Sequence, residues 1–350
     1  NLQQSIWDAA PGDTIILPSG VYEQSVKINK SITIDGNGAT LKVQSNESAI
    51  QIDTSRPVVL KNLEIQYGVA TKPKEGELSY AVYTSGGDLL IENCQFKDIS
   101  RPGDSPCAVS STDSGTLHIK NSRFDGFTYT IQFWNKTKGR VEDCLIMNSG
   151  HCGITIGEAS EGTLLRNIVT GSRFHGIRCT GGEIHADSNL IIANQNRGFY
   201  IGNKSAIGTL SNNLIVDNAT GINVFANSRL TVVNNTILRS TYAGVAISDT
   251  AKVDLKNNVV VSNETGLVGF SAEKDNTPSI SLRAANLVYG NTVQSEGIKL
   301  PSEMIGMDPQ FERPEEGLFT LRNHELKGMG LSDPIALHRL WSAWRTATAR

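Results

Sequence analysis

The sequence predicts a parallel β-solenoid, in which the chain winds through stacked coils of about 23 residues. Three observations lead to this fold class: a glycine that recurs once per coil, an asparagine that follows it, and short apolar segments with period-2 alternation. Helical spacing of apolar residues is missing from residue 14 to about residue 290. Three short strands with their turns account for one repeat of this length.

The glycine precedes Ile, Phe, Val or Leu at spacings of 23, 22, 23, 23 and 22 residues, at Gly153, Gly176, Gly198, Gly221, Gly244 and Gly266. The asparagine is followed by two mostly apolar residues, at Asn167, Asn189, Asn213, Asn235 and Asn258. Weaker echoes of the asparagine extend towards the N-terminus, at Asn62, Asn93, Asn121 and Asp143. Strands of this kind bury their apolar side when coils stack about 4.8 Å apart.

Both ends of the solenoid are expected to carry a helical cap, because an open coil end needs cover. The segment LQQSIWDAA places Leu2 and Ile6 on one face of an N-terminal helix. Ser332 or Asp333 is the expected N-cap of a C-terminal helix, with Pro334 in its first turn. The apolar face of that helix consists of Leu337, Leu340, Trp341 and Trp344.

Bulk composition excludes several classes of partner. The net charge of −3 provides no basic field for nucleic acid, and no apolar run approaches the roughly 18–20 residues of a membrane span. Five cysteines, an odd and sparse set, do not make a disulfide scaffold. The chain begins at Asn1 and not at Met, which is typical of a trimmed or mature form. We therefore expect a secreted or periplasmic protein whose export signal is already removed.

Two segments resemble a known family. Residues 9–41, AAPGDTIILPSGVYEQSVKINKSITIDGNGATL, are similar to the entry segment of single-stranded right-handed parallel β-helix proteins of the pectin-lyase-like superfamily. Residues 308–321, DPQFERPEEGLFTL, resemble a C-terminal segment of its bacterial members. The resemblance implies a right-handed parallel β-helix, and the superfamily includes polysaccharide lyases, glycoside hydrolases, alginate epimerases and non-enzymatic adhesins. We expect an N-terminal cap over 1–13, the β-helix over 14–290, and a C-terminal extension with the capping helix over 291–350.

Alignment of the coils on the glycine assigns residues to outward columns, because side chains alternate along a strand. The first column contains Gln132, Thr155, Arg178, Tyr200, Asn223 and Ala246. The second contains Trp134, Gly157, Thr180, Gly202, Phe225 and Ser248. The third, at the turn before the glycine, contains Tyr129, Cys152, His175, Arg197, Thr220 and Ala243. Chemically active side chains thus gather on two adjacent coils, within roughly 5–10 Å of one another.

Four residues of these coils are the candidate catalytic group. Chemistry at C5 of a uronic acid needs a cation that neutralises the carboxylate, a base that removes the C5 proton, and an acid. Arg178 or Arg197 suits the cation because a guanidinium binds a carboxylate bidentately. His175 suits the base, and Tyr200 the acid or a second base. The same types of group serve in lyases and epimerases that this chain resembles.

The candidate substrate-binding residues surround this group. Trp134 and Phe225 suit stacking on sugar rings. The remaining candidates are polar or aromatic residues of the same columns and turns: Tyr129, Gln132, His151, Thr155 and Asn223. Two insertions are expected to form one wall of a groove, VATKPKEGELS (69–79) and SRPGDSP (100–106), and a further insertion, SAEKDNTP (271–278), follows the same strand on a later coil.

We therefore predict a polysaccharide lyase that cleaves an anionic, uronate-containing polysaccharide by β-elimination. A glycoside hydrolase is the first alternative; its two carboxylates would come from turns or other faces, among Asp104, Asp113, Glu158, Glu161, Glu183 and Asp187. A uronate C5-epimerase and a non-catalytic glycan-binding protein are further alternatives. His185 and Asp187 form either a second site on the following strand or a surface hydrogen bond.

No cofactor or metal is expected. Calcium requires several oxygen ligands, and no outward column carries a dense acidic group. Zinc would have to use Cys152, His175 and His151, without any CxxC spacing. The expected partner is the polysaccharide or oligosaccharide substrate, with no nucleic acid and no membrane, and the expected state is a monomer.

Overall fold

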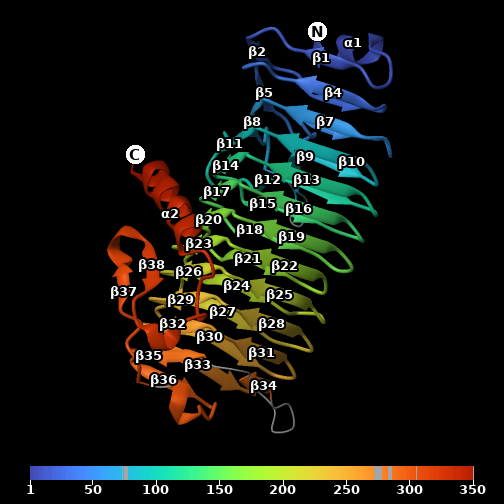
Figure 1. Cartoon of the computed structure of the whole chain (residues 1–350). Helices are drawn as coiled ribbons and strands as arrows, with labels where there is room; N and C mark the ends of the chain where they lie inside the picture. The colour runs from blue at the N-terminus through green and yellow to red at the C-terminus, as the bar shows by residue number, and fades with distance from the viewer. Residues whose placement is uncertain (73, 75–77, 272–277, 283–285, 305, 350) are drawn as a thin grey trace. The chain divides into compact units, whose positions relative to one another are not determined.

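The computed structural model describes all residues except 73, 75–77, 272–277, 283–285, 305 and 350. The chain forms two compact parts, Asn1–Gly162 and Thr163–Arg350, each of which is a parallel β-solenoid with three sheets, A, B and C. The predicted fold class is confirmed. Figure 1 shows how successive coils of each part lie one above the other. The expected loop wall 69–79 and the further insertion 271–278 lie partly outside the described residues.

In the first part, sheet A contains β1 (Thr14–Ile16), β4 (Ile32–Asp35), β7 (Val58–Lys61), β10 (Asp88–Glu92), β13 (Thr116–Lys120) and β16 (Lys138–Glu142). Sheet B contains β2 (Val21–Tyr22), β5 (Thr40–Gln44), β8 (Glu64–Gly68), β11 (Gln95–Asp98), β14 (Arg123–Asp125) and β17 (Leu145–Met147). Sheet C contains β3 (Val26–Ile28), β6 (Ile50–Ile52), β9 (Ser79–Ser85), β12 (Pro106–Thr112), β15 (Tyr129–Phe133) and β18 (Cys152–Ile156). Strand β19 (Glu161–Leu165) lies at the boundary between the parts.

In the second part, sheet A contains β22 (Glu183–Asp187), β25 (Ile207–Ser211), β28 (Arg229–Val233), β31 (Lys252–Lys256) and β34 (Ser279–Leu282). Sheet B contains β20 (Ile168–Thr170), β23 (Leu190–Ile192), β26 (Leu214–Val216), β29 (Thr236–Leu238), β32 (Val259–Val261) and β35 (Leu287–Tyr289). Sheet C contains β21 (His175–Cys179), β24 (Arg197–Ile201), β27 (Thr220–Val224), β30 (Ala243–Ser248), β33 (Thr265–Phe270) and β36 (Val293–Glu296).

The interior of each solenoid consists of apolar residues in register from coil to coil. In sheet A of the first part, Leu60, Ile91, Ile119 and Val141 are successive partners, and each is fully buried. Their neighbours along the strand point outwards, which produces the alternating burial of β10 and β13. The period-2 pattern therefore becomes continuous apolar columns, the main source of stability in a solenoid.

The recurring asparagines of the second part form a buried ladder. The backbone N–H and the side-chain amide of Asn189 both donate to Oδ1 of Asn213, at 3.0 and 2.9 Å. Asn213 donates in the same way to Asn235. A second ladder contains Asn194 and Asn218. Each step satisfies turn groups that would otherwise be buried without a partner.

The recurring Asn and Asp residues of the first part occupy a different position of the turn from the ladder asparagines of the second part. Asn62, Asn93, Asn121 and Asp143 have positive φ angles between 50° and 54°. In the second part, the residue immediately before a ladder asparagine has this conformation, as Ser188 does before Asn189. Asparagine and aspartate tolerate the left-handed region, which explains their recurrence there.

An ionic cluster lies on the outer face of sheet A in the first part. One carboxylate oxygen of Glu142 lies 2.7 Å from Nε2 of His118, and the other accepts a hydrogen bond of 2.7 Å from Arg140. The hydrogen bond from Arg140, together with that from His118, lowers the pKa of Glu142 to about 2. This carboxylate therefore stays ionised in the folded protein at pH values where it is protonated in the unfolded chain.

This cluster predicts a loss of stability at acid pH. Because the pKa of Glu142 is lower in the folded state than its usual 4.5, the stabilisation is complete above pH 4.5 and disappears as the pH falls towards about 2. The free energy of unfolding, measured with urea between these pH values, should decline more steeply with falling pH for the wild type than for Glu142→Gln. The exposed Glu23→Gln should follow the wild type, and identical profiles for all three proteins would contradict the assignment.

The N-terminal helix α1 (Leu2–Asp8) is capped by Asn1, buries Leu2 and Ile6 as predicted, and contacts β3 of the first coil. The C-terminal helix α2 (Pro334–Thr348) also begins as predicted, with Asp333 accepting a hydrogen bond from the amide of Ala336. An antiparallel hairpin, β37 (Phe311–Arg313) and β38 (Leu318–Leu321), packs against it. The 3₁₀ turns η1, η2 and η3 cover Ser302–Met304, Pro314–Glu316 and His324–Leu326.

A C-terminal cap is expected to cover the last coil of the second part. Helix α2 does not cover that coil. It lies beside sheet B, next to β20 and β23 (Figure 1). Trp344 donates a hydrogen bond of 3.1 Å to the Thr170 hydroxyl, and Trp341 is buried against Phe319. The physical reason is that the chain reverses direction after β36. The apolar face of α2 therefore packs against the side of the solenoid in the second part (Figure 1).

All five cysteines are buried and none is in a disulfide. Burial raises the pKa of the Cys94, Cys144 and Cys179 thiols to about 12. These thiols are therefore packing residues, as expected from their sparse spacing.

Candidate functional site

The outward columns predicted from the sequence are in register. In the second part, Arg178, Tyr200, Asn223 and Ala246 are successive Cα partners on sheet C. His175 and Arg197 are partners at the start of the same strands. In the first part, Gln132 and Thr155 are partners. The alignment of coils therefore places the candidate catalytic residues on β21 and β24, on neighbouring coils.

His175 and Tyr200 form the centre of this group. Their rings are stacked, with centroids 4.2 Å apart and planes only 6° from parallel. The stack leaves 7% of His175 exposed, and the imidazole belongs to the strand itself instead of the preceding turn. The Tyr200 hydroxyl donates a hydrogen bond of 3.0 Å to Oδ1 of Asn203. Two groups able to transfer protons thus lie side by side on the same face of the sheet.

Arg197 is held in one orientation beside the stack. Its Nε donates to Oδ1 of Asn223 at 2.9 Å, and a terminal nitrogen donates to Oδ1 of Asn196 at 3.0 Å. The guanidinium carbon lies 5.2 Å from the centroid of the Tyr200 ring. The side-chain amide of Asn223 also donates to the carbonyl of Ala246, which fixes its orientation. The remaining N–H groups of Arg197 are available to an anion.

Arg178 is the second cation of the site. It is half-buried, and its Cα partner on the next coil is Tyr200. Within the part of the chain that the structure describes, its guanidinium makes no hydrogen bond or ion pair. Arg178 therefore differs from Arg197, because its whole guanidinium fork can bind a carboxylate.

An open pocket of about 430 Å³ extends from Arg197 and Tyr200 towards the C-terminal coils of sheet C. Its lining contains Asn196, Arg197, Tyr200, Ala219, Thr220, Asn223, Phe225, Tyr242, Ala246, Ser248 and Phe270. Among the described residues, Arg197 is the one charged side chain of this lining. Phe225 is half-buried with its ring 4.8 Å from Tyr200, while Tyr242 and Phe270 are 55% and 48% exposed. The pocket is therefore lined by aromatic and small polar side chains.

The sequence alignment missed Tyr242 and Phe270. Phe270 is the Cα partner of Ser248, so one further coil in the second column would have found it. Tyr242 directly precedes Ala243 of the third column. Asn196 and Asn203 were also missed, because neither belongs to a column. Their side-chain oxygens accept hydrogen bonds from Arg197 and Tyr200 of β24.

Two expected substrate-binding residues of the first part are not accessible. Gln132 and Thr155 are 3% and 1% exposed, so the assumption that an outward column faces solvent is wrong for them. Trp134, two residues beyond Gln132, is half-buried, and its ring lies against Gly157 of the next coil.

Tyr129 and His151 of the first part form a pair of their own. Their ring centroids are 4.9 Å apart at an angle of 31°, and Nδ1 of His151 lies 2.9 Å from the sulfur of Cys152. The pair therefore exposes aromatic edges next to a buried thiol, which is compatible with the substrate-binding role predicted for both residues.

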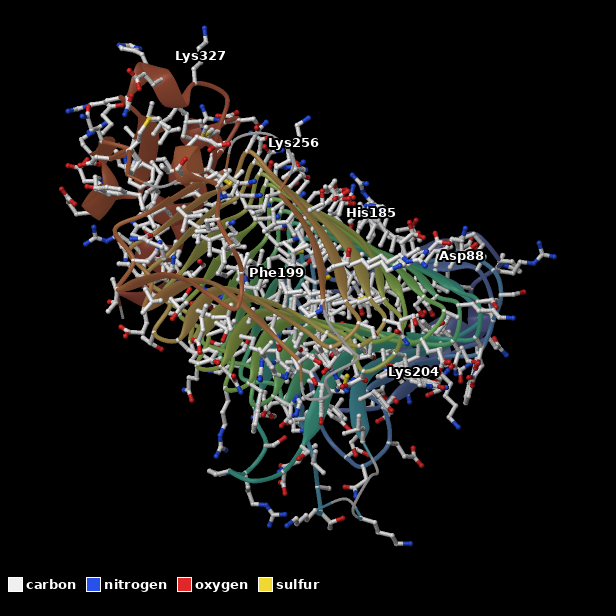
Figure 2. The ribbon with its side chains drawn as sticks, turned by 90° about the horizontal axis from the view of Figure 1, so that it is seen from below. Asp88, His185, Phe199, Lys204, Lys256 and Lys327 are labelled. Atoms are coloured by element: carbon white, nitrogen blue, oxygen red, sulfur yellow. The ribbon has the colours of Figure 1, made fainter. Side chains whose placement is uncertain are left out.

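The pair proposed as a second site, His185 and Asp187, does not form a hydrogen bond. Nε2 of His185 lies 2.8 Å from Glu183, and the side chain points away from the interior that holds Phe199 (Figure 2). Asp187 instead accepts hydrogen bonds from Ser211, Asn212 and Ser188. Ser211 is the Cα partner of Asp187 on the next coil, and Glu183 lies two residues before His185 on the same strand. This face therefore carries surface hydrogen bonds.

No group of three or more His, Cys, Asp or Glu residues suited to a metal ion occurs among the described residues. No helix in the described part of the chain has the length and apolar character needed to span a bilayer. No carboxylate occurs among the described residues of the pocket lining. The candidate site carries the imidazole of His175, the phenol of Tyr200 and the guanidinium groups of Arg178 and Arg197.

Comparison with known proteins gives one family match. The model of the family described as right handed beta helix region matches residues 48–207 and 187–298. No curated protein sequence matches the chain.

Solved structures share the fold. The periplasmic alginate epimerase AlgG is 17% identical, with a TM-score of 0.68 over 83% of this chain and 81% of that one. The A-module of the mannuronan C-5 epimerase AlgE6 of Azotobacter vinelandii is 14% identical, with a TM-score of 0.66 over 88% and 94%. The catalytic unit of a GH87 α-1,3-glucanase from Streptomyces thermodiastaticus strain HF3-3 is 11% identical, with a TM-score of 0.55 over 88% and 66%. At these identities the likeness shows the fold alone.

Proposed function

Because the chain belongs to the right-handed β-helix family, we propose that it is a carbohydrate-active enzyme that removes the C5 proton of a uronic acid within an anionic polysaccharide. C5-epimerisation is the proposed outcome. The observation that carries this proposal is the His175–Tyr200 stack, flanked on the same two coils by Arg178 and Arg197. The names of the two epimerases of similar fold support the choice of outcome.

The proposed first step uses the two kinds of group in this cluster. Arg197 or Arg178 neutralises the uronate carboxylate, which lowers the energy of the enolate formed when C5 loses its proton. His175 takes the proton, and the electron pair of the C5–H bond moves into the carboxylate. Since the pocket is open to solvent, the face of the sugar turned away from sheet C receives a proton from water. The C5 configuration is then inverted, and the protonated His175 gives its proton to the hydroxide that the water leaves.

β-Elimination, the outcome predicted from the sequence, is the second candidate. His175 and Tyr200 lie on the same face of sheet C, so both reach the sugar from one side. After the C5 proton is lost, the C4–O4 bond breaks, and Tyr200 would protonate the leaving oxygen. The glycoside hydrolase alternative needs two carboxylates about 5–9.5 Å apart, and none occurs among the described residues of the pocket lining.

One experiment separates these outcomes. The protein is incubated in D₂O with polymannuronate, polygalacturonate and glucuronate-containing polymers, and the products are examined by NMR. Epimerisation predicts deuterium at C5 without chain cleavage. Elimination predicts a new C4–C5 double bond with its ultraviolet absorbance, and hydrolysis predicts reducing ends without that bond. Binding without any product would leave a glycan-binding protein and would overturn the proposal.

The hydrogen bond from Nε of Arg197 to Oδ1 of Asn223, which we call the Asn223 clamp, predicts the effect of Asn223→Ala. Without its Oδ1, the guanidinium loses one hydrogen bond and its fixed direction, so kcat/KM should fall about tenfold. Asn223→Asp, which keeps an acceptor for Nε, should recover part of the loss. Asn227→Ala removes an exposed amide on the same coil and should behave as the wild type. Equal activity of Asn223→Ala and the wild type would contradict the positioning role.

We further propose that the protein acts outside the cytoplasm, in a secreted or periplasmic form. The polymeric substrate class supports this location, as does the periplasmic location of the alginate epimerase AlgG, which has a similar fold.

A further inference from the structure

The first outward column of sheet C changes character along the second part of the chain. Its six successive Cα partners are Arg178, Tyr200, Asn223, Ala246, Val268 and Glu296. At about 4.8 Å per coil, the column spans roughly 24 Å. A cation therefore stands at one end, uncharged residues in the middle, and an exposed carboxylate at the other end.

The middle of this column is a hollow. Ala243, Ala246 and Val268 are buried together and form an apolar floor. Tyr242 and Phe270 stand beside it with about half of their surfaces exposed. The pocket that contains this hollow is continuous with the candidate site, since Arg197 and Tyr200 line it as well. We call the surface formed by Tyr242, Ala246 and Phe270 the aromatic hollow.

A uronate would be unfavourable in the aromatic hollow. Among the described residues that line the pocket, Arg197 is the one cation, and it lies at the other end. Lys299 lines a separate pocket, which shares Phe270 with this one. Glu296 lies two coils beyond Ala246, at roughly 10 Å, and repels a second negative charge. The exposed rings of Tyr242 and Phe270 instead offer apolar faces on which a sugar ring can stack.

We propose that the aromatic hollow binds an uncharged sugar residue of the same polysaccharide chain, so that the preferred substrate alternates uronic acid with neutral sugars. This inference rests on the proposed function, because it extends the groove that begins at the candidate catalytic group. It narrows the substrate class from anionic polysaccharides in general to copolymers in which only some residues carry a carboxylate. Arg178 and Arg197 then bind the carboxylate of the uronate, and the aromatic hollow binds the neighbouring neutral sugar.

The test compares homopolymers with alternating copolymers. Polymannuronate and polygalacturonate represent the first class; hyaluronan, heparosan and the backbone of rhamnogalacturonan I represent the second. Binding is measured by calorimetry and C5 exchange by NMR in D₂O. The wild type should prefer a copolymer by about tenfold or more in affinity, the effect of one favourable contact of about 1.4 kcal/mol.

Three variants test whether the aromatic hollow causes the preference for copolymers over homopolymers. Tyr242→Ala and Phe270→Ala should each lower copolymer affinity about tenfold and leave the weak homopolymer affinity unchanged. Glu296→Gln removes the repulsion and should raise homopolymer affinity alone. Trp7→Ala, an exposed aromatic residue on α1, is the matched control and should change neither. The fold of each variant is checked by circular dichroism, which should match that of the wild type.

The outcomes separate the two proposals. C5 exchange on homopolymers and copolymers alike, with no shift in any variant, would overturn the neutral-sugar assignment and leave the proposed function intact. Copolymer binding that depends on Tyr242 and Phe270, without any C5 exchange or cleavage, would support the assignment and refute the proposed function.

Discussion

Replacing His175 by alanine is expected to lower kcat about 10²–10⁴-fold, the usual contribution of a general base. The imidazole stacks on Tyr200 at 4.2 Å and is the basic side chain of the candidate catalytic group. The measurement is the rate of deuterium incorporation at C5 of the best polysaccharide in the panel. His175→Phe keeps a ring against Tyr200 and cannot accept the proton, so its loss of activity should equal that of the alanine variant.

His185→Ala is the matched control for this experiment. His185 lies on sheet A, exposed and paired with Glu183, so the variant should retain the wild-type rate. Retention of near-normal C5 exchange in both His175 variants would show that the base lies elsewhere. A loss in all three proteins, accompanied by unfolding, would identify a structural effect instead.

The largest expected effect on stability is that of Asn194→Ala, at about 2–4 kcal/mol. The Oδ1 atom of Asn194 accepts the backbone N–H of Ser172, and its amide donates to the carbonyl of Val169 and to Asn218. Truncation leaves the buried groups of Ser172 and Val169 without partners. Urea denaturation should show a lower midpoint with an unchanged slope.

Gln195→Ala is the control for the ladder variant, because Gln195 is an exposed amide at the next position of the same turn. Its midpoint should match that of the wild type. Asn194→Asp should be at least as destabilising as the alanine variant, since a carboxylate cannot donate to Val169. A midpoint of Asn194→Ala indistinguishable from that of Gln195→Ala would refute a stabilising ladder.

The coil pattern could be predicted because each contact between neighbouring coils recurs at the same position of every coil. Gly176 needs close packing against the neighbouring coil, where its place next to Asn194 leaves no room for a Cβ. Asn189 needs a partner one coil away, so it recurs with every coil. The same repetition predicts Arg178 beside Tyr200 on the next coil, and the two are Cα partners in the structure.

Accessibility could not be predicted in the same way. Gln132 belongs to the outward column as expected, yet it is buried, because burial depends on the size of its neighbours and not on strand direction. Helix α2 has the predicted N-cap and apolar face, but its position beside sheet B follows from the path of the chain after β36. Both outcomes depend on contacts between residues far apart in sequence.

By itself, the sequence determined the fold class, the length of the coil and the register that brings His175, Arg178, Arg197 and Tyr200 onto adjacent strands. Only the tertiary structure decided how those side chains meet: the ring stack, the Asn223 clamp on Arg197, and the aromatic hollow bounded by Tyr242 and Phe270. The physical reason is the difference between two kinds of information. Register repeats with the backbone and is written in every coil, whereas rotamers, stacking and desolvation depend on all the neighbours of a side chain at once.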